Sequence, residues 1–161
     1  MVKKTGIGNL LVRSGVIDAT GLARARKAQE KHGISLTKAL VILGLSNEQE
    51  MATAIAKGMR LEALGLELPE VPAEVAALLS SDFCRKRAVV PLSLQGKILR
   101  LVLADPMDYS TIEDAEFRSG KQVLAVVGGH KQIQNLIQQI YTSRSHARSI
   151  RFGKGTGSSA F

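Results

Sequence analysis

Residues 6–29, GIGNLLVRSGVIDATGLARARKAQ, decide the fold of the first part of the chain, because the segment that follows repeats them. At an offset of 29 residues Ile7 aligns with Leu36, and the second copy is therefore residues 35–58. Repeated segments of this size are usually single structural units that bury their apolar faces against each other. The repeat therefore predicts two similar units packed together.

The first copy has the pattern helix, tight stop, helix. Ile7, Leu10 and Leu11 are spaced to share one face of a short helix. Gly15 follows, at a helix end where a left-handed backbone favours glycine. Asp18 then stands at the N-cap position of the next helix. The first copy therefore predicts two short helices.

The second copy has the same pattern. Ser35 is placed to cap a helix that Gly44 ends. Ser46 and Gln49 have the spacing of a capping box for a further helix that runs to about Ala56. Together the two copies predict a four-helix unit.

The paired copies resemble the tandem motifs of the N-terminal (MshEN-type) domain of type II secretion and type IV pilus assembly ATPases. That motif reads Arg-Leu-Gly, two variable residues, an aliphatic pair, two more residues, Gly and an aliphatic pair, then Leu and a closing Gln. Some members of the family bind cyclic di-GMP with the two motifs. The resemblance implies that the candidate ligand-binding positions are Ile7, Gly8, Leu11, Val12, Gly15, Val16, Ile17, Leu22, Gln29, Leu36, Leu40, Val41, Gly44 and Leu45.

This sequence also departs from the motif. Gly6 and Ser35 stand where the family has Arg, and Arg26 stands where it has Leu. Thr37 replaces a Gly, and Gly58 replaces the closing Gln. The departures predict that cyclic di-GMP binds weakly or not at all, while the architecture is kept. Without those motif residues, we expect an apolar groove that suits a partner helix as well as a nucleotide. Its lining would be Leu11, Val12, Leu40 and Val41.

The second part of the chain has the order α–β–β–α–β–α. Two alternating apolar runs around Gln95-Gly96 predict a β-hairpin. Pro91 lies in the first run and cannot donate a ladder hydrogen bond, so we expect that strand to lie at a sheet edge or to pair on one side only at Pro91. A helix to Arg118, a strand at 122–127 and a helix at 131–141 follow. We expect an α+β fold, a tandem helix-turn-helix unit followed by a small α/β subdomain.

The domain boundaries follow from changes in pattern. Residues 1–60 form the helical subdomain, and residues 61–72 lose helical periodicity and end near two prolines, as a connector does. Residues 73–141 form the α/β subdomain. Residues 142–161 are rich in Ser, Gly and Arg, which predicts a basic flexible tail.

The α/β part resembles the same family more faithfully than the helical part does. Its members typically show Arg before Val-x-Pro-Leu, a Gly turn, a strand that ends in Ala-Asp-Pro, then Asp, Phe, Gly and an apolar strand. The matching residues here are Arg87, Val89–Leu92, Gly96, Ala104-Asp105-Pro106, Asp114, Phe117, Gly120 and Val123. The resemblance extends over about residues 5–141.

Composition excludes several classes of function. The net charge is +8, and residues 1–60 contribute +6 of it, from ten Lys or Arg and four acidic residues. Basic residues at helical spacing predict a solvated face, with an anionic partner as the alternative. The 4% aromatic content leaves few rings to stack on bases, so we expect no specific nucleic-acid partner. Cys84 is the one cysteine, so no internal disulfide forms. One Cys and three scattered His predict no metal site, and no cofactor is expected.

No apolar run has the length of a spanning helix, and Arg13 interrupts the first apolar stretch, so we expect neither a signal peptide nor membrane insertion. The chain is expected to be cytoplasmic, or peripheral at the inner membrane through a partner.

Catalysis is not expected. Asp105 at a strand end and His130 at a helix start stand where α/β enzymes keep reactive groups, but an Asp-Pro turn and a helix start explain them. The tail sequence GKGTGSS lacks the full phosphate-loop pattern. The resemblance implies a docking module of a secretion or pilus ATPase system, whose partner is an inner-membrane platform protein or a motor ATPase subunit. The alternative is a cyclic di-GMP sensor.

Overall fold

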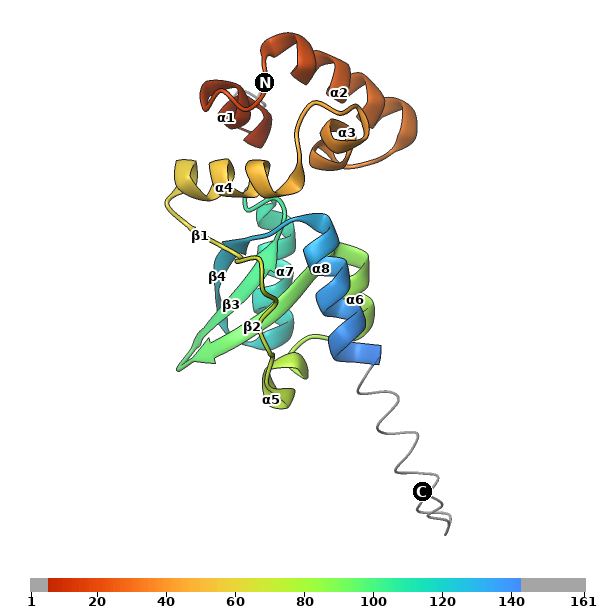
Figure 1. Cartoon of the computed structure of the whole chain (residues 1–161). Helices are drawn as coiled ribbons and strands as arrows, with labels where there is room; N and C mark the ends of the chain where they lie inside the picture. Colours follow the sequence, from red (N-terminus) through yellow and green to blue (C-terminus); the bar gives the residue numbers. More distant parts are fainter. Residues whose placement is uncertain (1–5, 143–161) are drawn as a thin grey trace.

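The structure is a computed structural model that describes residues 6–142. Four helices form one end of the molecule, and a four-stranded sheet with helices on its faces forms the other (Figure 1). The last of the four helices, α4 (Glu48–Met59), lies between the other three and the sheet (Figure 1). The mixed helical and sheet architecture confirms the expected α+β fold. The predicted flexible tail and its glycine-rich stretch lie outside the described residues, apart from Thr142.

The repeat forms four helices as predicted. Gly15 and Gly44 have φ of +84° and +73°, so each ends a turn that a side chain would strain. Asp18 Oδ1 accepts a hydrogen bond of 2.7 Å from the Gly21 N–H, which confirms the predicted cap. The helices are α1 (Ile7–Arg13), α2 (Ala19–His32), α3 (Leu36–Ile42) and α4 (Glu48–Met59).

Two local predictions in the second copy have different outcomes. The Ser35 hydroxyl accepts a hydrogen bond of 3.2 Å from the Lys38 N–H and caps α3 as expected. The expected cap of α4 is wrong by one residue, because Asn47 Oδ1 accepts from the Glu50 N–H at 2.8 Å. Asn47 has the extended backbone of an N-cap, and the Ser46 hydroxyl bonds elsewhere.

The sheet has the strand order β1-β4-β3-β2. β2 and β3 form the predicted antiparallel hairpin, whose turn contains Gly96 with φ of +61°. β2 is an edge strand, as Pro91 requires. β3 and β4 are parallel, and α7 (Tyr109–Ser119) connects them as a crossover helix. The strands are β1 (Glu62–Ala63), β2 (Val89–Gln95), β3 (Ile98–Leu103) and β4 (Gln122–Val127).

The helices of the α/β part follow the predicted order. They are α5 (Ala73–Ala76), α6 (Ser81–Arg87), α7 (Tyr109–Ser119) and α8 (His130–Ile137), with a π-helical turn at Gln138–Thr142. Thr111 and Ala115 are the buried residues of α7. Phe117, one of the family-match positions, is 89% exposed.

The connector contains a strand that the sequence analysis did not predict. Glu62 and Ala63 pair in parallel with β4, and Glu62 also forms an ion pair with Arg100 at 2.7 Å. Two residues are too few to show a strand period, which is why the pattern missed them. The connector is therefore part of the sheet over these residues. The boundaries at 60 and 72 stay a prediction.

Buried side chains form two clusters. One lies among α1–α4 and includes Leu11, Leu40 and Met51. The other lies around the sheet and includes Leu101 and Leu136. Val127, at the carboxyl end of β4, packs into the helical cluster, so the two parts are in direct contact.

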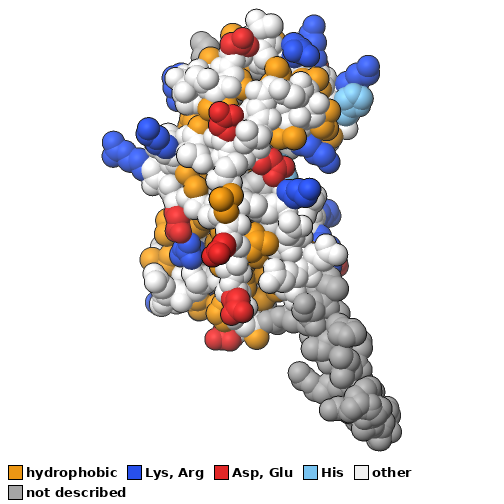
Figure 2. Space-filling view, viewed as in Figure 1, with side chains coloured by type: hydrophobic (Ala, Val, Ile, Leu, Met, Phe, Trp, Pro, Cys, Tyr) orange, Lys and Arg blue, Asp and Glu red, His pale blue; other side chains and the backbone are white. Residues whose placement is uncertain are grey.

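On the face shown in Figure 2, Lys and Arg side chains project separately from the edges of the helical part instead of gathering in one patch. This arrangement agrees with the solvated basic surface expected from their helical spacing.

Candidate functional site

A pocket of about 420 Å³ lies between the helical repeats and the sheet. Its helical wall contains the first residues of both motifs, because α1 and α3 begin there. Its other wall is the carboxyl end of β3 with the adjoining loop, the position where open α/β sheets commonly bind ligands. The lining residues are Gly6, Ile7, Gly8, Arg26, Gln29, Ser35, Leu36, Thr37, Arg87, Ala88, Leu103, Ala104, Asp105, Met107, Asp108 and His130.

His130 joins the two walls. Its Nε2 lies 3.0 Å from the hydroxyl oxygens of both Ser35 and Thr37. Burial lowers the pKa of His130 below its usual 6.5, Glu48 raises it and Lys38 lowers it. The imidazole is therefore neutral at pH 7, where it can donate or accept one hydrogen bond at Nε2.

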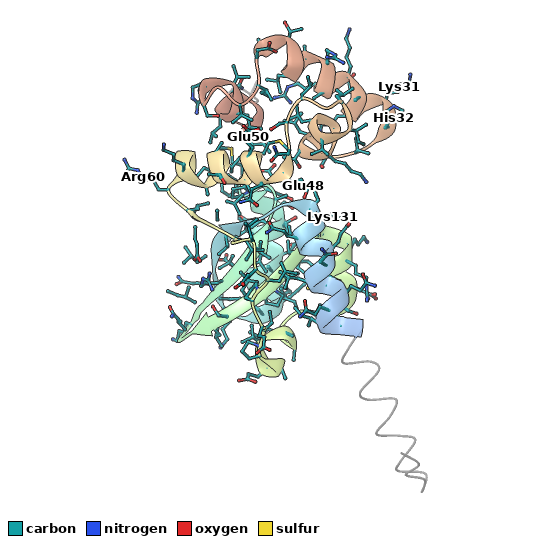
Figure 3. All side chains as sticks on the ribbon, viewed as in Figure 1. Lys31, His32, Glu48, Glu50, Arg60 and Lys131 are labelled. Atoms are coloured by element: carbon teal, nitrogen blue, oxygen red, sulfur yellow. The ribbon has the colours of Figure 1, made fainter. Side chains whose placement is uncertain are left out.

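Glu48 makes a second contact beside the pocket. Its Oε1 accepts a hydrogen bond of 2.9 Å from the backbone N–H of Lys131, in the first turn of α8 (Figure 3). A Cβ at Gly129 would lie 2.5 Å from Glu48 Oε1, so only glycine leaves room for this carboxylate. A carboxylate at a helix N-terminus is favoured by the helix dipole. The helical repeats thus help to cap α8.

Arg87 is held within the α/β wall. Its guanidinium donates to Thr111 Oγ1 at 2.7 Å and forms an ion pair with Asp114. It lies at the end of α6, just before Ala88, whose φ of +57° reverses the chain into β2. The Arg87 guanidinium is therefore already bonded to two side chains of α7.

The two pocket carboxylates are also engaged locally. Asp105 Oδ1 accepts from the Met107 N–H at 2.9 Å, in the turn that follows β3. Asp108 caps α7 by accepting from the Thr111 N–H and hydroxyl. Burial raises the pKa of Asp105, and the neighbouring charge of Asp108 adds to the shift. This wall presents acceptor oxygens to the pocket.

Comparisons with known proteins agree with this architecture. The model of the MshEN domain family matches residues 59–147, more than half of the chain.

The chain belongs to the MshEN domain family.

Curated relatives of this MshEN domain include a type II secretion system protein and a type IV pilus assembly ATPase. It is 31% identical over 143 residues to the type II secretion system protein E of Xanthomonas campestris pv. campestris, a match that covers 86% of this chain and 25% of the relative. It is 27% identical over 138 residues to the type IV pilus assembly ATPase PilB of Myxococcus xanthus, covering 86% of this chain and 24% of that protein. The MshEN domain thus spans about a quarter of the length of these two relatives.

Solved structures share the fold. The N-terminal domain of XpsE is 29% identical, with a TM-score of 0.65, and the match covers 84% of this chain and 93% of that one. A structure of MshE with cdg is 24% identical, with a TM-score of 0.68, covering 84% of this chain and 98% of that one. The second likeness shows the fold alone.

The structure divides the fourteen expected binding positions. Four of them line the pocket of the MshEN domain, namely Ile7, Gly8, Gln29 and Leu36. Those buried among α1–α4 away from it are Leu11, Ile17, Leu22 and Leu40. Those half-buried or exposed outside it are Val12, Gly15, Val16, Val41, Gly44 and Leu45. The expected apolar groove is wrong, because Leu11 and Leu40 have no exposed surface.

The residues that depart from the family motif also divide into some that line the pocket and one that does not. Gly6, Ser35 and Thr37 line the pocket, whereas Gly58 does not. A Cβ at Gly58 would lie 2.9 Å from Leu10 Cδ1, so this glycine allows α4 to pack on α1.

The motif pattern of the repeats does not predict the α/β wall of the pocket. In the sequence, Asp105 is a family match and a candidate catalytic group, His130 is a candidate catalytic group, and Arg87 is a family match. Their common signal is position, since Asp105 follows one parallel strand and His130 follows the next. Among residues 6–142 no group of three or more His, Cys, Asp or Glu side chains could hold a metal ion. Within the same range no helix is long and apolar enough to cross a membrane.

Proposed function

We propose that this MshEN domain is a non-catalytic docking and regulatory module of a type II secretion or type IV pilus ATPase system. Its partner is the cytoplasmic region of an inner-membrane platform protein, or a motor ATPase subunit, and through that partner it is peripheral at the inner membrane. The matched relatives include a type IV pilus assembly ATPase and a type II secretion system protein.

The exposed face of α7 carries this proposal. Phe117 is 89% exposed and Tyr109 is 60% exposed. They are eight residues apart with Glu113 midway, so the three share one stripe of the helix. Aromatic residues are enriched at the energetic centres of protein interfaces.

Aromatic residues are scarce in this chain, so the position of each exposed one is informative. The chain has four Phe and two Tyr, and four of these six lie within the described residues. Phe83 is buried, and Tyr141 is half-buried with its hydroxyl donating to Ala76 O and Leu79 O. The other two described aromatic residues both face solvent on α7. This stripe suits an apolar partner surface with a basic residue placed for Glu113.

The test is binding of the platform protein's cytoplasmic region to the full chain by titration calorimetry. Phe117→Ala should weaken binding about tenfold or more, as expected for an interface anchor. Leu66→Ala is the matched control, because Leu66 is 81% exposed but lies in the connector. Equal losses for both variants, or none for Phe117→Ala, would count against docking through α7.

A second candidate function is a cyclic di-GMP sensor, and the pocket favours it. The first residues of both motifs meet in one cavity with the sheet. MshE, which shares this fold, was solved with cdg. A ligand that binds only the folded state must raise the melting temperature, so a thermal shift with the dinucleotide tests this candidate.

A further inference from the structure

Arg26 projects over the first motif. A Cβ at Gly8 would lie 2.8 Å from Arg26 Nη2, so the guanidinium lies against the glycine backbone. Arg26 is half-buried and lines the pocket, whereas Arg24, on the same helix, is exposed. The absence of a side chain at Gly8 is what lets Arg26 reach this position.

Arg26 has no partner among the described residues. Neither of the two ion pairs within residues 6–142 includes it, and no hydrogen bond within that range reaches its guanidinium. The other lining cation, Arg87, is paired with Asp114. A half-buried guanidinium favours an anionic acceptor, because its five donors are otherwise only partly satisfied.

Further polar groups line the same pocket. Gln29 is one helical turn from Arg26 and adds an amide. Ser35 and Thr37 add hydroxyls that His130 already contacts. A phosphate is the anion that best matches such a set, because it accepts a bidentate guanidinium and further hydrogen bonds together.

The volume of the pocket and its remaining walls indicate which groups, besides the phosphate, the ligand carries. A volume of about 420 Å³ falls within the range of pockets that hold small organic ligands. Ile7, Leu36 and Met107 offer apolar surface for a ring. Asp105 and Asp108 line the sheet side and accept hydrogen bonds, as an amino group on that ring would require.

We propose that the pocket binds a nucleoside phosphate, with one phosphate group held by Arg26. The inference rests on the second candidate function and deepens it, because it moves anion recognition from the vacated motif positions to α2. Arg26 replaces a Leu of the family motif, so this recognition belongs to this chain's own sequence.

The experiment compares GMP with guanosine by titration calorimetry on the full chain at near-physiological salt. The wild type should bind GMP at least about tenfold more tightly than guanosine, the gain expected from a charge-assisted contact. Arg26→Leu should remove that difference and leave guanosine binding unchanged. Arg26→Lys should give an intermediate affinity, because an ammonium lacks the planar fork. Arg24→Leu, the matched control on the same helix, should behave as the wild type. Thermal unfolding of each variant checks that it is folded.

The possible results separate the inference from the candidate function. Equal GMP affinity in the wild type and Arg26→Leu, or equal affinity for GMP and guanosine, overturns the inference. Tight binding of cyclic di-GMP that does not depend on Arg26 also overturns it, but leaves the sensor function standing. If GMP, guanosine and cyclic di-GMP all fail to bind, the inference and the sensor function both fall, and docking through α7 is unaffected.

Discussion

The Glu48 carboxylate of the second repeat accepts a hydrogen bond of 2.9 Å from the Lys131 backbone N–H at the start of α8. Together with the contact of His130 with Thr37, it joins the helical repeats to the α/β part on one side of the pocket. Figure 3 shows Glu48 and Lys131 at this junction, and Lys31 and His32 far from it at the end of α2. The two parts are therefore coupled by polar contacts as well as by packing at Val127.

Replacement of Glu48 should weaken that coupling. Glu48→Gln removes the charge at the α8 N-terminus and should lower the free energy of unfolding by about 1 kcal/mol. Glu50→Gln is the control, since Glu50 is exposed on the same helix and contacts only its own helix start through Ser46. Urea denaturation measures the free energy of unfolding of both variants. A loss for Glu50→Gln as large as that for Glu48→Gln would show that the Lys131 contact contributes nothing specific.

Stability should fall as pH falls through the titration of His130. Burial lowers the pKa of the folded-state imidazole below 6.5, so the unfolded chain binds the proton first. Stability is therefore fully present above about pH 6.5 and is lost as pH falls from there to the lower folded pKa. Melting temperatures between about pH 8 and pH 5 measure the effect. His130→Gln should flatten this part of the profile, and an unchanged slope would exclude His130 as its source.

Cys84 should be unreactive in the folded protein. It is fully buried, and burial raises the pKa of its thiol to about 11, so almost no thiolate exists near pH 8. Alkylation by iodoacetamide should proceed only as fast as the chain unfolds, and should become rapid in denaturing urea. Mass spectrometry follows the adduct. Fast native-state labelling would mean that the space between α6 and Tyr141, whose hydroxyl lies 3.3 Å from Cys84 Sγ, opens readily.

Cyclic di-GMP should bind weakly, with a dissociation constant well above about a micromolar. Both motif arginines are absent, at Gly6 and Ser35, and two charged hydrogen bonds are worth about 3–6 kcal/mol. That loss corresponds to an affinity lower on the order of a hundredfold to ten-thousandfold. Calorimetry at near-physiological salt measures it, and micromolar or tighter binding would contradict the prediction.

The converse experiment restores the motif where the structure allows it. Gly6→Arg and Ser35→Arg, with Thr37→Gly, should create or sharply improve binding if the pocket is otherwise suitable, because all three positions line it. Gly58→Gln should be left out, because a side chain there would displace Leu10. Restored arginines without any gain would mean that the pocket does not fit the dinucleotide.

The sequence by itself determined the four helices of the repeat, the hairpin, and the order of the elements that follow residue 72. The 29-residue repeat, Gly15 and Gly44 predicted the four helices, because a left-handed helix end favours glycine whatever surrounds it. Pro91 has no N–H to donate, which predicted an edge strand or pairing on one side only at Pro91, and β2 lies at the edge of the sheet. The family resemblance predicted four of the pocket residues through the motif positions.

Only the tertiary structure decided which residues meet. β1 forms because β4 offers a partner edge, and two residues carry no pattern of their own. Leu11 and Leu40 match the motif but are buried, because the two repeats pack on those side chains. Arg26 and His130 lie 104 positions apart (130 − 26) and share a pocket because α4 packs the repeats onto the carboxyl ends of the parallel strands. A periodic pattern records which face of an element is apolar, whereas the site depends on which two faces are brought together.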